Sequence, residues 1–183
     1  MNHEEMKLYH EKQKLQLCAL HALNSLFQRK IFNKDMLDSI VHGYDKSLFW
    51  NEYSTFYTGN YDLRIIVDAL KLQGYTIRII ASTESFNTIN FKDCFGLLLN
   101  ITVERPFFDR LPIVRSLTKP GRHWLTIKSI DGEQYYNFDS KLSRPKLIGN
   151  QNNLIDYLNT FDRAQTHIFL VIEEASVDEF EQQ

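Results

Sequence analysis

The sequence predicts an α+β fold in which helices come first and a mostly antiparallel sheet follows. Apolar residues recur at helical spacing up to about residue 73, and the segment after Gly74 changes to the alternation typical of β-strands. Further along, Asp131-Gly132 lies between two alternating segments, which is a strong hairpin signal. Helices that precede strands, instead of alternating with them, favour α+β over a doubly wound α/β domain.

The helices are predicted from periodic apolar faces and from residues typical of helix ends. The three expected in the first part are residues 15–28, residues 33–43 with Asn33 as N-cap and Gly43 as the C′ residue, and a helix capped by Asn60 that ends before Gly74. A short helix is expected later, near residues 154–161. Cys18 therefore lies in the first turn of the first helix.

The strands are predicted from β-branched alternation and from buried apolar runs. They are expected at residues 75–80, 95–101, 123–129, 133–139 and 167–172. Residues 102–122 hold three of the four prolines and are expected to form a long irregular loop. Its basic side chains are interpreted as a solvated rim, with anionic lipid or an acidic partner as the alternative; they are Arg105, Arg110, Arg115, Lys119 and Arg122.

Length and composition limit the class of protein. The 183 residues fit one domain, which we place at residues 1–173 and follow with a short, flexible acidic tail at 174–183. A formal charge of −2 argues against nucleic acid as the main partner. Two cysteines argue against a disulfide-built secreted scaffold. The absence of a signal peptide or a spanning apolar run favours a cytoplasmic protein; we expect a monomer, and peripheral membrane contact stays open.

Cys18 is the first candidate for chemistry, because a thiol near a helix N-terminus meets the positive end of the helix dipole and unpaired backbone N–H groups. The alternative is a small buried apolar residue. His21 is one turn further along the same helix, where it leaves little room for a substrate, and we interpret it as hydrogen-bonded inside the fold. Cys94 precedes a buried strand and is interpreted as packing.

His123 is the better partner for the thiol, because it begins a predicted strand whose end can approach the end of a helix. A two-residue turn at Asp131-Gly132 would turn Asp139 away from it. A three-residue loop, with Gly132 in the left-handed region of a bulge, places Asp139 directly opposite His123. We predict the bulged hairpin, with Asn137 as a reserve orienter.

A thiol, an imidazole and a carboxylate form a nucleophile, base and orienter for acyl transfer. The remaining requirement is a donor for the oxyanion that develops during attack. Gln13 precedes Cys18 by five residues, so that its amide and the Cys18 N–H together could provide it. An exposed polar residue is the alternative.

These residues resemble a known family. The string from His10 to Leu26, with Gln13, Cys18 and His21, looks like the N-terminal signature of Josephin domains, which are papain-like deubiquitinating cysteine proteases. Two further blocks agree: Gly59-Asn60-Tyr61-Asp62, and Gly121-Arg122-His123-Trp124 followed by 135–142. The resemblance extends from about Tyr9 to Ile172 and is strongest to the short single-domain members. It implies a papain-like fold, with the N-terminal catalytic helix and a helical hairpin packed on the sheet.

The resemblance also implies roles. Cys18 would be the nucleophile, His123 the base, Asp139 the orienter and Gln13 the oxyanion donor, in hydrolysis of the isopeptide bond after the ubiquitin C-terminal glycine without metal or organic cofactor. Ubiquitin and ubiquitinated proteins would be the partners. The implied ubiquitin contacts are Ile31, Phe32, Leu63, Arg64 and Trp124. Residues 32–58 would match the mobile helical hairpin. Two alternatives stay open: a weakly active ubiquitin-binding module, and a papain-like acyl-transfer enzyme on another substrate.

Overall fold

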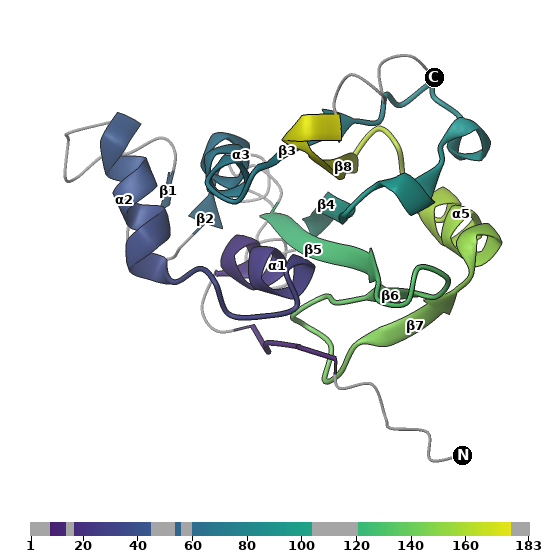
Figure 1. Ribbon diagram of the computed structural model, residues 1–183, viewed down its shortest axis with the longest axis horizontal. Coiled ribbons are helices and arrows are strands. Elements are labelled where there is room, and N and C mark those ends of the chain that lie inside the picture. Colours follow the sequence, from purple (N-terminus) through teal and green to yellow (C-terminus); the bar gives the residue numbers. More distant parts are fainter. Residues whose placement is uncertain (1–7, 14–16, 45–53, 56–59, 104–120, 177–183) are drawn as a thin grey trace, which may run out of the picture.

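The computed structural model describes residues 8–13, 17–44, 54–55, 60–103 and 121–176 (Figure 1). Its α-helices are α1 (Cys18–Leu26), α2 (Lys34–Tyr44), α3 (Leu63–Lys71) and α5 (Gln151–Asn159). The strands are β1 (Ser54–Thr55), β2 (Asn60–Tyr61), β3 (Tyr75–Ile79), β4 (Gly96–Val103), β5 (Gly121–Ser129), β6 (Tyr135–Asn137), β7 (Lys146–Gly149) and β8 (His167–Glu173). Short 3₁₀ turns occur at Phe86–Thr88, Phe91–Asp93 and Glu174–Ser176.

Six strands form one sheet in the order β3-β8-β4-β5-β6-β7, and every neighbouring pair is antiparallel. The predicted α+β class and the antiparallel sheet are therefore confirmed. Strand β8 lies between β3 and β4, so it is an interior strand that joins the edge strand β3 to the rest of the sheet. Strands β1 and β2 pair separately as a small two-stranded ribbon, which the sequence analysis did not predict.

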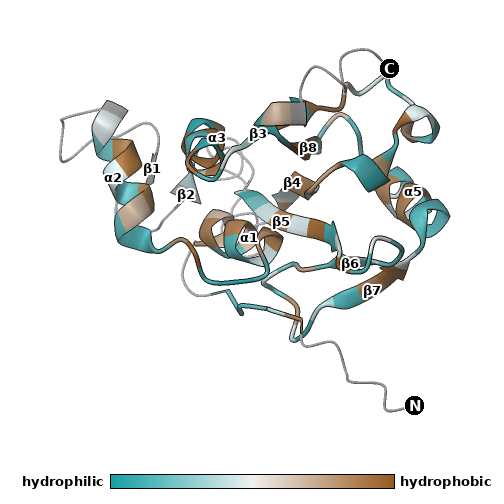
Figure 2. Ribbon diagram, viewed as in Figure 1, coloured by the Kyte–Doolittle hydropathy of each residue, from teal (hydrophilic) through white to brown (hydrophobic). Residues whose placement is uncertain are grey.

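The alternating strands bury both faces of the sheet. On one face, Leu98, Trp124 and Val171 pack with α1, α2 and α3; on the other, neighbours such as Leu97 and Leu125 pack with α5 and the 3₁₀ turns. Figure 2 shows hydrophobic segments alternating with hydrophilic ones along the helices that flank the sheet. Among the described helices, none combines the length and the apolar character needed to cross a bilayer.

The helix ends agree with the sequence at some positions and differ at others. Asn33 caps α2 as predicted, since its Oδ1 accepts the Met36 N–H at 2.9 Å. Gly43, predicted to lie past the end of α2, is inside the helix. The predicted cap of α3 is also wrong: Asn60 belongs to β2, and Asp62 caps the helix by accepting the Arg64 N–H at 2.9 Å.

The later helix and the strands β6 and β8 lie near their predicted positions, whereas β7 was not predicted. Helix α5 begins earlier than predicted, because Asn150 and Asn153 form reciprocal side-chain to backbone hydrogen bonds that start it at Gln151. The last strand occupies His167–Glu173, as expected. Strand β6 is shorter than predicted and ends at Asn137.

The register of the β5–β6 hairpin differs from both predicted registers. Ser129 pairs with Tyr135 and Ile127 with Asn137, so the loop covers residues 130–134. Asp131 causes this longer loop, because its Oδ1 accepts the backbone N–H groups of Glu133 at 2.9 Å and Gln134 at 2.7 Å. Gly132 does adopt the predicted left-handed conformation, with φ of 80°. His123 and Asp139 are therefore not cross-strand partners.

Several predicted features fall partly outside the described residues. The irregular loop is shorter than expected at both ends, because β4 extends to Val103 and β5 begins at Gly121, and residues 104–120 between them are not described. Much of the expected hairpin at 32–58 is likewise outside the description. Of the predicted tail, Glu174–Ser176 form a 3₁₀ turn.

Candidate active site

Cys18 is the first residue of α1, which begins later and ends earlier than the predicted helix over residues 15–28, so Cys18 does lie in the first turn; it is 4% exposed. Leu17 occupies the N-cap position and provides no side-chain hydrogen bond to the first turn. The N-cap side chain therefore does not compete for the first-turn N–H groups of the helix. The helix is held on the sheet by the buried Thr126 hydroxyl, which donates to the Ala22 carbonyl at 2.6 Å.

His123 lies between Cys18 and Asp139. Its Nε2 donates to Asp139 Oδ1 at 2.7 Å, and the ring is also hydrogen-bonded to the Cys18 side chain. Because Nε2 is hydrogen-bonded to Asp139, Nδ1 is the ring nitrogen that faces the Cys18 thiol. The imidazole is 2% exposed, so the ring is fixed in place by its neighbours. The three predicted residues thus come together, although the hairpin register that predicted their meeting is wrong.

The contact between His123 and Asp139 is reached by a different route. Strand β6 ends at Asn137, and the Phe138 N–H still donates to the Thr126 carbonyl at 2.8 Å. The chain then leaves the ladder in a turn at residues 139–143, which we call the Asp139 turn. The carboxylate therefore reaches His123 from a turn and not from the facing strand.

The electrostatics of the pair favour a charged imidazole and a charged carboxylate. Burial acts to lower the pKa of His123, but hydrogen bonds and electrostatic interactions with Asp139 and Cys18 raise it on balance. Burial acts to raise the pKa of Asp139, but the His123 hydrogen bond and charge, with the Lys141 N–H, lower it on balance. Both shifts favour the charged form of each partner.

Asn137 positions Asp139 without touching the imidazole. Its Oδ1 accepts the Asp139 N–H at 2.7 Å, and its Nδ2 donates to the Tyr157 hydroxyl on α5 at 2.9 Å. With these groups occupied, Asn137 supports the backbone of Asp139 and is not a second orienter of His123. The Lys141 N–H, which donates to Asp139 Oδ1 at 2.9 Å, fixes the carboxylate from the other side.

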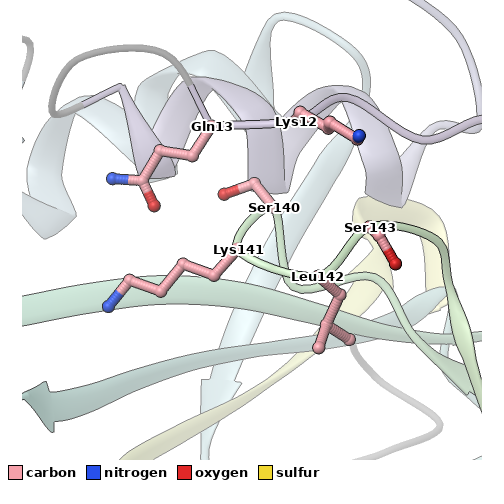
Figure 3. A pocket seen from close by; sticks show the side chains of 6 residues that line it. All are labelled: Lys12, Gln13, Ser140, Lys141, Leu142 and Ser143. Atoms are coloured by element: carbon pink, nitrogen blue, oxygen red, sulfur yellow. The ribbon is translucent and has the colours of Figure 1, made fainter.

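Gln13 lies beside this centre. Its backbone N–H donates to the Ser140 carbonyl at 2.8 Å, so the segment that precedes α1 is joined to the Asp139 turn. Figure 3 shows the Gln13 amide next to the Ser140 hydroxyl, where both line a pocket. Residues 14–16, which connect Gln13 to Leu17, lie outside the description.

Residues 8–13, which we call the N-terminal strap, are held against α1 by a network that the sequence analysis missed in part. Glu11 accepts hydrogen bonds from Tyr9 and Asn24, and its Oε2 lies 2.6 Å from His21 Nδ1. His21 is therefore hydrogen-bonded inside the fold, as predicted. On the opposite side, His10 Nε2 lies 2.9 Å from the Leu142 carbonyl in the Asp139 turn. Spacing along the chain carries no signal for Glu11 or His10.

Cys94 differs from Cys18 in both position and chemistry. Burial raises the pKa of Cys94 to about 12, and its Sγ donates to the Phe91 carbonyl at 3.1 Å. The thiol is therefore protonated and unreactive, in agreement with the packing interpretation. Within the described residues, no group of three or more His, Cys, Asp or Glu side chains is arranged to hold a metal ion.

The residues expected to contact ubiquitin differ in exposure. Phe32 is 1% exposed and Trp124 is 4% exposed, the latter packed on Phe169 with ring centroids 5.7 Å apart. Both side chains belong to the core and have little exposed surface, and their contact with ubiquitin stays a prediction. Ile31 and Leu63 are half-buried against the same core cluster, and Arg64 is exposed on the first turn of α3.

The comparison with known proteins agrees with this geometry. The family model described as Josephin matches residues 13–172, which is most of the chain. The chain belongs to the Josephin family. Its relatives include a Josephin-like protein of Drosophila melanogaster, 31% identical over 169 residues that cover 91% of this chain and 74% of the relative. Human Josephin-2 is 33% identical over 152 residues, covering 82% of this chain and 78% of the relative.

A more distant Josephin relative is human ataxin-3, 29% identical over 159 residues that cover 77% of this chain and 39% of ataxin-3. The helices and the six-stranded antiparallel sheet are consistent with the papain-like Josephin fold. The Josephin family includes deubiquitinating enzymes, which places this chain in a family of cysteine proteases.

Proposed function

We propose that this Josephin protein is a deubiquitinase that hydrolyses the isopeptide bond after the C-terminal glycine of ubiquitin. The observation that carries the proposal is the position of His123 between Cys18 and Asp139, with Nε2 on the carboxylate and the other ring nitrogen toward the thiol. This is the order that a cysteine nucleophile, its base and an orienter require. Family membership supports ubiquitin as the substrate.

In the proposed reaction, the Cys18 thiolate attacks the glycine carbonyl carbon, and the carbonyl oxygen becomes an oxyanion. The Cys18 N–H and the Gln13 amide would stabilise that charge. The His123 imidazolium then donates its proton to the leaving lysine amine, and a thioester forms on Cys18. Water next loses a proton to His123 and attacks the thioester, which releases the ubiquitin carboxylate and regenerates the thiol.

The acyl side of the substrate would contact Ile31, Leu63 and Arg64. Ile31 and Leu63 pack against one core cluster, and each keeps part of its surface open. Phe32 would support this surface from below, because its own ring is buried. We also propose that the protein acts as a monomer in the cytoplasm. Its substrates there would be ubiquitinated client proteins of the ubiquitin conjugation pathways.

An electrophilic ubiquitin probe tests the proposal directly. We expect the probe to label the wild-type chain, and labelling to be lost in Cys18→Ala and strongly reduced in His123→Ala. Cys94→Ala is the matched control, since it removes the other thiol and should label like the wild type. Labelling that persists in Cys18→Ala but disappears in Cys94→Ala would overturn the assignment. Ubiquitin binding without cleavage of any ubiquitin conjugate would favour the interaction-module alternative.

A further inference from the structure

An open pocket of about 590 Å³ lies directly beside the proposed oxyanion donor (Figure 3). It is lined by Lys12 and Gln13 of the N-terminal strap and by Ser140, Lys141, Leu142 and Ser143 of the Asp139 turn. Three hydrogen bonds fix its walls: Gln13 N–H to Ser140 at 2.8 Å, His10 to Leu142 at 2.9 Å, and Leu142 N–H to Asp139 at 2.9 Å. The proposed mechanism does not use this space.

The pocket is positively charged. Among the described residues that line it there are two ammonium groups, on Lys12 and Lys141, and no carboxylate. Both side chains are exposed, and in the part of the chain that the structure describes neither forms a salt bridge. Figure 3 shows the Lys12 and Lys141 side chains on opposite sides of Ser140, extending in opposite directions. Two cations around one opening favour a segment with negative charge between them.

The location of the pocket indicates which side of the scissile bond it faces, the ubiquitin side or the leaving-lysine side. Figure 1 shows α2 and α3 on one side of α1, and the N-terminal strap with the Asp139 turn on the other. Ile31 lies in the segment between α1 and α2, where its neighbours Lys30 and Phe32 line a pocket with Lys12 of the strap, but Leu63 and Arg64, the other proposed ubiquitin contacts, lie on α3. With the acyl group on the α3 side, the leaving lysine and the residues next to it face the pocket. Its volume suits a few residues of an extended segment.

We propose that this pocket binds the client segment that carries the modified lysine and that it favours acidic residues beside that lysine. This inference rests on the proposed function, and it adds a substrate preference to it. The ammonium groups of Lys12 and Lys141 would pair with the client carboxylates, and the fixed walls would keep the segment next to Gln13. The preference should weaken as salt is added, because both cations are exposed.

Short isopeptide substrates test this proposal. Ubiquitin is joined through its terminal glycine to the lysine of peptides that differ only in the flanking residues, which are Asp, Gln or Lys. We expect kcat/KM at low salt to be about fivefold to tenfold higher for the Asp peptide than for the Lys peptide, which is the size expected from a pair of exposed ionic contacts. In the double variant Lys12→Gln, Lys141→Gln the ratio should fall to about one.

The charge-reversed double variant Lys12→Glu, Lys141→Glu should invert the ratio and favour the Lys peptide. Lys146→Gln is the matched control, since this exposed lysine on β7 lies outside the pocket and should keep the wild-type ratio. The ratio within each variant cancels any shared effect on the catalytic centre. Equal rates for the three peptides in the wild type would overturn the inference.

A substrate in which ubiquitin carries a small neutral dye separates the two proposals. Hydrolysis of the dye substrate without a flanking-residue preference would leave the proposed function standing and reject the preference of the pocket for acidic client residues. A chain that hydrolyses neither the dye substrate nor any peptide conjugate would overturn the proposed function and, with it, this inference.

Discussion

Asp139 Oδ1 accepts two hydrogen bonds at once, from the His123 ring at 2.7 Å and from the Lys141 N–H at 2.9 Å. The second bond fixes the carboxylate to its own turn, so that its negative charge stays at Nε2 of the imidazole. An amide at this position could still accept a hydrogen bond but would carry no charge. The carboxylate therefore contributes the field that raises the pKa of His123.

Asp139→Asn should separate two effects of the carboxylate on His123: the hydrogen bond that orients the ring, and the negative charge that raises its pKa. Without the negative charge, the pKa of His123 falls and the imidazolium loses its proton at lower pH. We expect kcat/KM to decrease on the order of tenfold and the alkaline limb of its pH profile to move to lower pH. The measurement is the pH dependence of cleavage of a ubiquitin–dye substrate.

Asp131→Asn is the matched control for this change, because Asp131 lies in the exposed hairpin loop. Its pH profile should match that of the wild type. An alkaline limb that does not move in Asp139→Asn would contradict the role of the carboxylate charge.

At the scale of single residues, the sequence predicted which residues meet at the candidate site better than it predicted how exposed the other candidate residues are. Cys18, His123 and Asp139 meet as expected, because nucleophile, base and orienter impose a recognisable set of residue types. Phe32 and Trp124 matched a family pattern, yet burial depends on neighbours such as Phe169, which lie far away in the sequence. Exposure could therefore not be predicted from the pattern that identified them.

At the scale of the elements, the attachment of the N-terminal strap to α1 depends on one partly buried carboxylate, that of Glu11. Burial acts to raise the pKa of Glu11 above the ordinary 4.5, but the hydrogen bonds from Tyr9, His21 and Asn24 lower it on balance. A carboxyl group with a lowered pKa in the folded state adds stability above its unfolded pKa. That stability is lost as the pH falls through the folded value.

Glu11→Gln should remove this pH dependence. At pH 7 we expect the variant to lose about 1–3 kcal/mol of unfolding free energy, because charged hydrogen bonds become neutral ones. From about pH 4.5 downward, the wild type should lose stability faster than the variant, so that the two curves converge. Urea denaturation between pH 7 and pH 3 measures both curves, and parallel curves would contradict the expectation.

The contact between α1 and the sheet is close at Gly96. A Cβ there would lie 2.6 Å from Leu26 Cδ1 and 3.2 Å from the Ile127 carbonyl oxygen. Leu26 is 0% exposed, so its side chain has no room to move away. Gly96→Ala should therefore lower the unfolding free energy by about 1–3 kcal/mol, measured by chemical denaturation.

Gly43→Ala provides the opposite case, because nothing lies within 4 Å of its added Cβ and the residue is inside α2. It should leave stability unchanged or raise it by about 0.5–1 kcal/mol. Equal changes in unfolding free energy for the two substitutions would show that the close contact with Leu26 is not the cause of the destabilisation by Gly96→Ala.

Element positions were more predictable than their ends and registers. The helix at Cys18 and the strand at residues 167–173 follow from long apolar patterns that local chemistry does not disturb. The hairpin register was not predictable from the Asp-Gly pair alone, because the Asp131 side chain accepts two further N–H groups and lengthens the loop. Asn60 and Asp62 compete as caps in the same way, and only pairing of β2 with β1 decides between them.

At the scale of the whole molecule, one sheet separates two cores. Leu97 and Leu98 are neighbours on β4, yet Leu97 packs on the α5 side and Leu98 on the α1 side. Strands β4, β5 and β8 each contribute side chains to both cores, so neither layer keeps its packing if the sheet opens. The two cores should therefore unfold together.

Leu97→Ala and Leu98→Ala test this coupling, since both side chains are at most 1% exposed. Each should reduce the unfolding free energy by about 2–5 kcal/mol through the cavity that it leaves. Circular dichroism and tryptophan fluorescence should give one coincident transition for each variant. Leu147→Ala is the control, because Leu147 on β7 is 54% exposed. It should change the unfolding free energy by less than about 0.5 kcal/mol. Separate transitions would show that the cores are independent.

The backbone hydrogen bond from Gln13 to Ser140 has a consequence for how the catalytic residues move. Gln13 precedes the nucleophile helix, and Ser140 follows the orienting carboxylate, so this bond closes a ring that contains Cys18, His123 and Asp139. A shift of the strap therefore displaces the Asp139 turn as well. We therefore expect Gln13, the proposed oxyanion donor, and the Asp139 carboxylate to move together, so that a partner that pulled on either segment would change both.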